Sequence, residues 1–183
     1  MNRSRTYFTA DTHFGCARTL RVRKRPFASL EAMDATLVAR WNDTVGSKDE
    51  VYHLGDVATL DHADIGGVLG RLNGRIHLII GNNDDAEKLA ALGRFASIAE
   101  MRELTLDGQR VFLCHYPMRD WPSEWRGAWH LFGHVHGRFD DKPLGLSLDV
   151  GVDTHAYAPV SFAGVREAMA RRPQPARRGA AAG

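Results

Sequence analysis

The chain has 183 residues, of which 44% are hydrophobic and 25% charged, with a formal net charge of +2. This length fits one domain that can bury about two-thirds of its unfolded surface. No apolar run approaches the roughly 20 residues that a membrane span needs, and the first residues lack the apolar segment of a secretory signal. We therefore expect a cytoplasmic protein with no membrane partner. Because Cys16 and Cys114 are the only cysteines, a disulfide framework is not expected and both thiols are expected to be reduced.

The first predicted elements are short apolar runs rich in Val, Ile, Phe and Tyr, which are typical of buried strands. In chain order they are TYFTA (6–10), EVYHLG (50–55), RIHLII (75–80), RVFLC (110–114) and WHLF (129–132). Asp107-Gly108 separates LTL from RVFLC and indicates a hairpin, so at least one strand pair is antiparallel.

Four stretches between these runs favour helices. Ser29 can cap a helix that ends near Gly46 and places Leu30, Met33, Leu37 and Trp41 on one face. Asp61 can cap a second helix that extends to about Asn73. This helix is a weaker prediction, because three glycines within it disfavour helical structure. Further candidates are 84–92 and 161–171, the second capped by Ser161. Strands and helices mixed in this way predict an α/β sandwich with its helices outside.

The positive charge is concentrated at the C-terminal end of the chain. Four arginines lie within residues 171–183, and without them 20 basic residues stand against 22 acidic ones. This segment has Pro, Gly and Ala without apolar periodicity, so we expect a disordered basic tail after a single domain at 1–170. Contact of the tail with nucleic acid or a membrane surface is a weaker alternative.

A polar motif directly follows each of the five apolar runs, where strands of a rigid sheet would place site residues. The candidates are Asp11, His13, Asp56, Asn82, His115, His134 and His136. Singly, each is typical of a turn or a cap, and the glycines around His134 and His136 also fit a simple turn. Together, their carboxylate, imidazole and amide donors suit divalent transition ions, and seven ligands exceed what one tetrahedral ion uses.

These motifs resemble a known family. Asp11-Thr-His13, Gly55-Asp56, Gly81-Asn-Asn-Asp84, His115 and Gly133-His-Val-His136 are similar, in order and spacing, to the five blocks of the calcineurin-like metallophosphoesterases. DTHFG, RPF, YHLGD, HYP, GHVHGR and DVGVD further resemble a small bacterial and phage branch of predicted phosphoesterases. The resemblance covers residues 5 to about 170. It implies a four-layer αββα sandwich with mixed sheets, flanking helices and a two-metal site at one edge.

The resemblance also implies which residues bind the two divalent ions, with Mn or Fe expected first and Co, Ni, Zn or Mg as alternatives. One ion would be held by Asp11, His13, Asp56 and His136. The other would be held by Asp56, Asn82, His115 and His134. Asp56 would bridge the ions, and a hydroxide bound to both would attack a phosphate ester, so no side-chain nucleophile is needed.

Two positions depart from the family pattern. The third block usually reads Gly-Asn-His-Asp, in which the Asp orients a His that contacts the phosphate, but this chain has Asn83 before Asp84. Asn83 and Asp84 are therefore the candidate catalytic residues, although Asn cannot donate a proton near pH 7. Where the branch often has a second His, this chain has Cys16, either a small buried residue or a substrate contact.

Other features have weaker interpretations. The basic residues from Arg18 to Arg25 either draw phosphate substrates to the metals or form a solvated loop, and Arg18 is the candidate substrate contact. Three tryptophans spaced by four residues after His115 predict a packed flap, with nucleotide stacking as the alternative; they are Trp121, Trp125 and Trp129. Asp149 and Asp153 are expected at a strand end. Nothing singles out His62, His130 or His155.

Three functions agree with these observations. The first is a dinuclear hydrolase of phosphodiesters or activated phosphomonoesters, which would act on a small phosphate ester or a nucleotide. The second is a non-catalytic metal-binding scaffold for protein or nucleic-acid partners. The third is a nucleic-acid-binding module that uses the basic segments and would bind in a salt-sensitive way without turnover.

Overall fold

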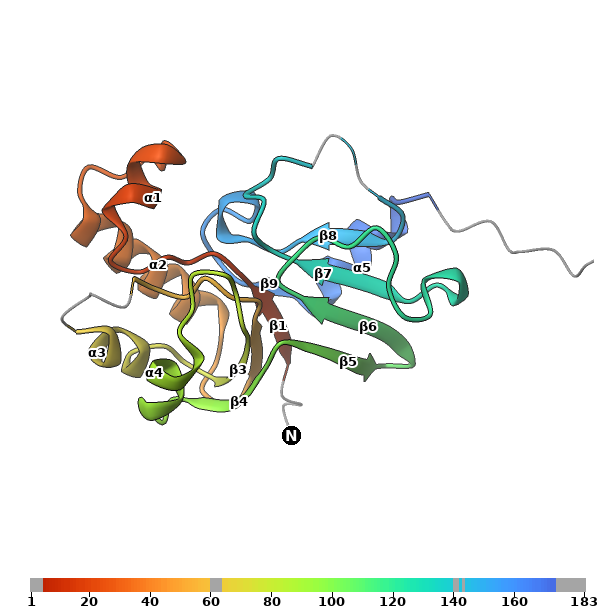
Figure 1. The fold of residues 1–183 in the computed structure, drawn as a ribbon, viewed down its shortest axis with the longest axis horizontal. Helices are drawn as coiled ribbons and strands as arrows, with labels where there is room; N and C mark the ends of the chain where they lie inside the picture. Colours follow the sequence, from red (N-terminus) through yellow and green to blue (C-terminus); the bar gives the residue numbers. More distant parts are fainter. Residues whose placement is uncertain (1–4, 60–63, 140–141, 143, 174–183) are drawn as a thin grey trace, which may run out of the picture.

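Two mixed β-sheets lie face to face with helices around them (Figure 1). The structure is a computed structural model that describes residues 5–59, 64–139, 142 and 144–173. The expected sandwich of two mixed sheets with flanking helices is confirmed. None of the helices in the described part of the chain has the length and apolar character that crossing a bilayer requires.

The first sheet has five strands in the order β4-β3-β2-β1-β9. Their bounds are β1 (Thr6–Thr9), β2 (Glu50–His53), β3 (Arg75–Ile79), β4 (Phe95–Ala99) and β9 (Val160–Ser161). The first four strands are parallel, and β9 runs antiparallel to β1. The carboxyl ends of β1, β2 and β3, each followed by predicted ligands, therefore meet at one edge of the sheet.

The second sheet has the order β5-β6-β7-β8. Its strands are β5 (Met101–Leu106), β6 (Gln109–Cys114), β7 (Trp129–Phe132) and β8 (Ser147–Asp149). The predicted hairpin joins β5 to β6, with Asp107 at φ 48° and Gly108 at φ 79°, as a turn with two left-handed residues requires. Because β6, β7 and β8 are parallel, the loops that begin at His115 and Gly133 leave this sheet at the same edge.

The described part of the chain also contains five α-helices and two short 3₁₀ segments. They are α1 (Ala17–Val22), α2 (Leu30–Thr44), α3 (Ile65–Gly70), α4 (Ala86–Ala91), α5 (Phe162–Ala170), η1 (Glu124–Arg126) and η2 (Val152–Thr154). Ser29 and Ser161 cap α2 and α5 as predicted. The predicted start of α3 was wrong, because Asp64 caps this helix. Asp61, which was the predicted cap, lies outside the described residues. So do His62 and the tail from residue 174. Helix α1 was not predicted.

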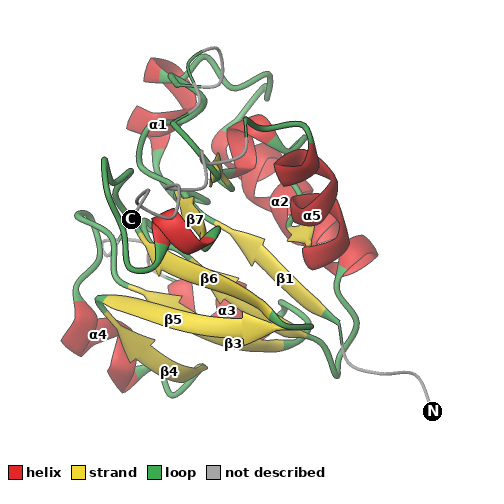
Figure 2. Ribbon diagram, turned by 90° about the vertical axis from the view of Figure 1, so that its right-hand side faces the viewer, coloured by secondary structure: helices red, strands yellow, loops and turns green. Residues whose placement is uncertain are grey.

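Two apolar cores hold these layers together. Met33, Leu37 and Trp41 on the predicted face of α2 pack in one cluster with Val51 and Leu78 of the five-stranded sheet. A second cluster joins the sheets to each other, and it includes Phe8, Leu54, Leu113, Leu131 and Leu148. Figure 2 shows the strands layered in this way with helices outside them. Both sheets are thereby fixed relative to the loops at their common edge.

Candidate metal centre

The loops after four strands are bound to one another at the edge of the two sheets. Asp11 N donates to Gly55 O at 2.9 Å and His13 N donates to Asp56 O at 3.0 Å, which joins the loops after β1 and β2. Gly133 N donates to His115 O at 3.0 Å and joins the loops after β6 and β7. The N–H of His134 then donates to Oδ2 of Asp11 at 2.8 Å. A buried carboxylate thus connects one sheet to the other.

Five of the seven predicted ligands have left-handed backbone conformations. Their φ angles lie between 50° and 71°, in Asp11, His13, Asp56, His134 and His136. Such conformations cost of order 1–3 kcal/mol each in residues other than glycine, and they persist only where surrounding contacts impose them. Their concentration at one edge indicates that the fold holds these side chains in position at the expense of stability.

Two further carboxylates hold the loops from behind. Asp84, expected as a catalytic residue, accepts N–H bonds from Asp56, Val57 and Gly81 at 2.8 to 2.9 Å. Asp149 accepts from Gly137 at 2.8 Å and from Gly151 at 2.7 Å. Asp84 therefore has a positioning role in this geometry. Burial raises the pKa of Asp84 above its ordinary value, although its backbone hydrogen bonds act in the opposite direction.

Two glycines allow the carboxylates to approach the backbone. A Cβ on Gly133 would lie 2.5 Å from Oδ2 of Asp11, and one on Gly81 would lie 2.4 Å from Oδ1 of Asp56. Neither neighbour is a flexible chain end that could move away. Glycine is required at these positions because a ligand carboxylate occupies the space of the side chain.

The predicted ligands come together as two overlapping groups. The metal-binding atoms of Asp11, His13 and His136 lie within 4.8 Å of one another, and so do those of Asp11, Asp56 and His115. Oδ2 of Asp56 is 3.5 Å from His13 Nε2, whereas Oδ1 is 3.7 Å from His115 Nε2. The two oxygens of Asp56 therefore face histidines of the two different ligand sets.

The remaining two predicted ligands lie beside the second group. Oδ1 of Asn82 is 3.0 Å from His115 Nε2. The ring of His134 lies edge-on to His115 at 5.1 Å and to Tyr116 at 4.9 Å. The structure thus places all seven predicted ligands around one edge of the two sheets.

Hydrogen bonds at the far side of two imidazoles determine which nitrogen faces the centre. Nδ1 of His115 donates to Leu54 O at 2.7 Å, and Nδ1 of His136 donates to Oδ2 of Asp153 at 2.7 Å. In the neutral rings, Nε2 is then a lone-pair donor suited to a metal. The amide oxygen of Asn82 faces Nε2 of His115 at 3.0 Å, so two acceptors lie next to each other. A cation between them would stabilise this arrangement.

The electrostatics of the centre also fit a cation. Burial, together with the nearby charges of Asp56 and Asp149, raises the pKa of Asp11 well above its ordinary value. Burial lowers the pKa of His13 to about 4, so this ring is neutral near pH 7. Oδ1 of Asp11 is buried without a hydrogen-bond partner among the described residues. A positive ion at this oxygen would offset the repulsion between the neighbouring carboxylates and would supply the contact that the oxygen lacks.

A cleft of about 590 Å³ opens onto the candidate centre. It is lined by His13, Cys16, Arg18, Thr19, Val22, Arg23, Asp56, Ala58, Thr59, Asn82, Asn83, His134 and His136. Cys16 caps α1, and its Sγ accepts from the hydroxyl of Thr19 at 3.2 Å. Asn83 donates from its backbone N and its Nδ2 to Asp56, at 2.9 and 2.6 Å. The predicted substrate contacts Arg18 and Cys16 thus lie on the wall of the same cleft.

One member of the basic cluster does not belong to this wall. Arg25 was expected to be an exposed charge, but its side chain is fully buried and donates to Asp153, Asp11 O and Thr12 O. Asp153 was expected at a strand end, whereas it lies in η2; Asp149 does end β8. Arg25 and Asp153 lie 128 positions apart, and nothing in the sequence paired the RPF motif that contains one with the DVGVD motif that contains the other.

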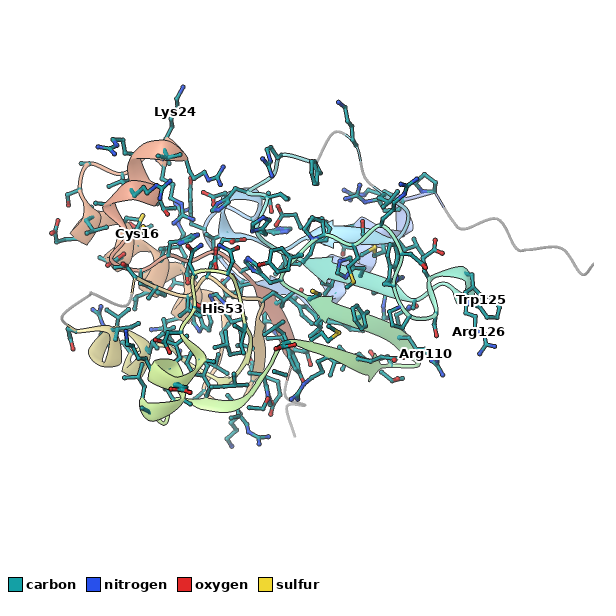
Figure 3. All side chains as sticks on the ribbon, in the orientation of Figure 1. Cys16, Lys24, His53, Arg110, Trp125 and Arg126 are labelled. Carbon is teal, nitrogen blue, oxygen red and sulfur yellow. The ribbon has the colours of Figure 1, made fainter. Side chains whose placement is uncertain are left out.

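The three tryptophans do not form a stacking surface at the cleft. Trp121 and Trp129 are buried, and Trp129 lies in β7 and not in the preceding loop. Trp125 is exposed, but the guanidinium of Arg126 lies 4.2 Å from its ring centre. Figure 3 places Trp125 and Arg126 at the end of the molecule opposite Cys16. Trp121 and Trp129 are therefore packed in the interior, as one of the two interpretations predicted. The alternative, nucleotide stacking at the centre, has no support.

Two histidines that the sequence placed inside strands prove to be buried. His53 Nε2 lies 2.9 Å from the hydroxyl of Thr12, which also donates to Val57 O. Burial lowers the pKa of His53 to about 3, so it supports the Asp11 loop as a neutral ring. His77 bonds Glu50 and Ser97 within the five-stranded sheet.

The chain is similar to several known proteins over most of its length. It is 32% identical to an uncharacterised protein of Methanocaldococcus jannaschii, over 88% of this chain and 89% of that protein. It is 31% identical to the gene 66 protein of Mycobacterium phage L5, over 82% and 87% of the two chains. A solved structure of a protein of unknown function from Aquifex aeolicus has the same fold, with a TM-score of 0.71 at 21% identity over 90% and 99% of the chains.

The remaining comparison concerns the family itself. Residues 6–148 match the model of the calcineurin-like phosphoesterase superfamily domain. This range contains all seven predicted ligands, from Asp11 to His136. The chain therefore belongs to the calcineurin-like phosphoesterase superfamily.

Proposed function

We propose that this protein is a metal-dependent hydrolase of phosphate esters with a centre of two divalent ions. The main support is Oδ1 of Asp11, a buried carboxylate oxygen that has no hydrogen-bond partner among the described residues. It lies 4.0 Å from His13 Nε2 and 3.8 Å from His136 Nε2. These distances are too long for hydrogen bonds, and three such donor atoms that converge on one point suit a metal ion between them.

We assign the seven residues to the two ions as the family pattern does. Asp11, His13, Asp56 and His136 would hold one ion, and Asp56, Asn82, His115 and His134 the other. This mixture of imidazole, carboxylate and amide donors without thiolate favours Mn or Fe, with Co, Ni, Zn and Mg as alternatives. When bound, such ions supply charge neutralisation for a phosphoryl group and an activated water.

The protein's own groups would then select and orient the ester. Asn83 lies in the cleft beside Asp56, and its amide can donate a hydrogen bond to a phosphoryl oxygen. It cannot deliver a proton to a departing oxygen near pH 7. We therefore expect phosphodiesters or activated phosphomonoesters to be better substrates than monoesters of poor leaving groups.

Turnover of an ester panel tests this proposal. Aryl and alkyl phosphomonoesters, phosphodiesters and cyclic nucleotides are incubated with the metal-free protein, with and without Mn(II). Turnover should require the metal, should stop when a chelator is added, and should be highest for aryl diesters. Metal binding without turnover of any ester would instead favour the non-catalytic scaffold.

A second prediction concerns the arginines on the cleft wall. Arg18 and Arg23 are exposed and line the cleft, whereas Arg21 is exposed on the same helix but does not line it. Arg18→Ala and Arg23→Ala should each raise KM about two- to fivefold at low salt, because exposed charges act over short distances through a screened field. Arg21→Ala is the matched control.

Steady-state kinetics at two ionic strengths check this expectation. The effect should shrink at high salt, and kcat should be unchanged. Equal effects of all three substitutions would mean that the cluster acts only through its total charge, and no effect at low salt would exclude any contact with substrate.

A further inference from the structure

A buried ion pair lies directly behind one half of the candidate centre. Arg25 Nε donates to Oδ1 of Asp153 and Nη2 donates to Oδ2, both at 2.8 Å. The side chain of Arg25 is 0% exposed and that of Asp153 is 12% exposed. The two oxygens of Asp153 are thus paired with two nitrogens of one guanidinium, a bidentate geometry that fixes both side chains.

Each member of the pair also contacts the ligand loops. Arg25 donates from Nη2 to Asp11 O at 2.6 Å and from Nη1 to Thr12 O at 2.9 Å. These carbonyls belong to the segment in which Asp11 and His13 have positive φ angles. The guanidinium therefore holds the strained backbone that directs both ligands, and it uses the planar set of donors that only arginine has.

Asp153 contacts the third ligand of the same group. Its Oδ2 accepts from both Arg25 Nη2 and His136 Nδ1, the latter at 2.7 Å. This contact places the proton of the neutral ring on Nδ1 and leaves Nε2 free toward Oδ1 of Asp11. A carboxylate behind a ligand histidine fixes its tautomer and makes it a stronger donor.

The contacts of the pair are confined to one half of the centre. Within the described part of the chain, and apart from the bonds within the pair, the side-chain hydrogen bonds of Arg25 and Asp153 reach Asp11, Thr12, His136 and Sδ of Met33, which is not a predicted ligand. They do not reach Asn82, His115 or His134, which would hold the other ion. The loops of those residues are bound instead by Asp84, Leu54 O and the Asp11 carboxylate.

We infer that the Arg25–Asp153 pair is a positioning device for one ion, the one that Asp11, His13 and His136 would hold. The inference rests on the proposed function. It gives the RPF and DVGVD motifs a common role, because the structure brings the Arg of one onto the second Asp of the other. Neither residue lines the cleft, so both would act through the ligands that they orient.

A purely structural ion pair would behave differently. Loss of a buried charge partner destabilises the whole fold, which would weaken both ions alike or neither. Arg40 provides a matched control, because its guanidinium lies over the ring of Tyr157, as that of Arg25 also does. Arg40 in addition donates to Ala156 O just beyond η2. Unlike Arg25, Arg40 is exposed and has no described contact with a predicted ligand.

Titration of the full metal-free chain with Mn(II) tests the inference. The free ion is followed by electron paramagnetic resonance in the wild type, Asp153→Asn, Arg25→Lys and Arg40→Met. Asp153→Asn should weaken one ion about 10- to 100-fold and change the other less than about twofold, since in either orientation the amide NH2 would face an N–H of Arg25 or His136 where the carboxylate accepts. Arg25→Lys should weaken the same ion, because one ammonium cannot reach all four acceptors, and Arg40→Met should bind like the wild type.

Equal weakening of both ions, or the same loss in Arg40→Met, would overturn the inference. A second measurement does not depend on any bound ion. Long-range ¹H–¹⁵N spectra of the metal-free wild type should show His136 with its proton on Nδ1, and a proton on Nε2 would overturn the inference. A wild-type chain that binds fewer than two ions would contradict the proposed dinuclear centre, whereas the tautomer would still decide the role of Asp153.

Discussion

Asp56→Ala is expected to weaken both ions and to lower ester turnover at least about 10³-fold, the scale on which loss of a main charge-stabilising group acts. The reason lies in its two oxygens, which face His13 Nε2 at 3.5 Å and His115 Nε2 at 3.7 Å. The side chain is buried, so water could not easily replace it. Metal content after dialysis and turnover of an aryl diester measure the two effects.

His13→Ala is the matched comparison, because His13 belongs to one ligand set only. It should lose chiefly one ion and retain the other, and its turnover should fall less than that of Asp56→Ala. Thermal unfolding without metal should show that both variants remain folded. If Asp56→Ala kept one ion at wild-type affinity, Asp56 would not be shared and the dinuclear assignment would be wrong.

The strands and the ligand positions could be predicted because their signals are local. Each apolar run ends in a polar motif, and parallel strands bring their carboxyl ends to one edge whatever else the chain does. The hairpin at Asp107-Gly108 was also predictable, since two left-handed residues are required there. Seven candidate residues could thus be placed at one edge of the sheets before any distance was known.

The supporting contacts could not be predicted, because they depend on tertiary packing. Arg25 follows four other basic residues within eight positions, so its sequence context indicates an exposed cluster. Its burial depends on Asp153, which lies 128 positions away. The start of α3 and the existence of α1 were missed for another reason, because each is only six residues long and so has little periodicity.

Asn83→His is expected to raise turnover of alkyl esters more than that of aryl esters. In the wild type nothing at this position can protonate the departing oxygen, so the rate should depend steeply on the leaving group's tolerance of negative charge. A well-placed general acid typically contributes about 10²- to 10⁴-fold. Asn83→His should therefore give a flatter dependence of log rate on leaving-group pKa, measured over a series of esters with both ions present.

The structure indicates what the new histidine would need. Residue 83 lies in the cleft with its side chain at Asp56, so the ring would start beside the centre. In Asp84, Oδ2 accepts two backbone N–H groups, but among the described residues Oδ1 accepts only that of Val57 at 2.9 Å. Oδ1 therefore retains a lone pair that could orient an imidazole, as the family's usual Asp does. Asn83→Gln keeps an amide without adding an acid and should leave the slope unchanged. Equal slopes in the wild type and Asn83→His would mean that another group already donates the proton, and that Asn83 serves only to hold the phosphoryl oxygen.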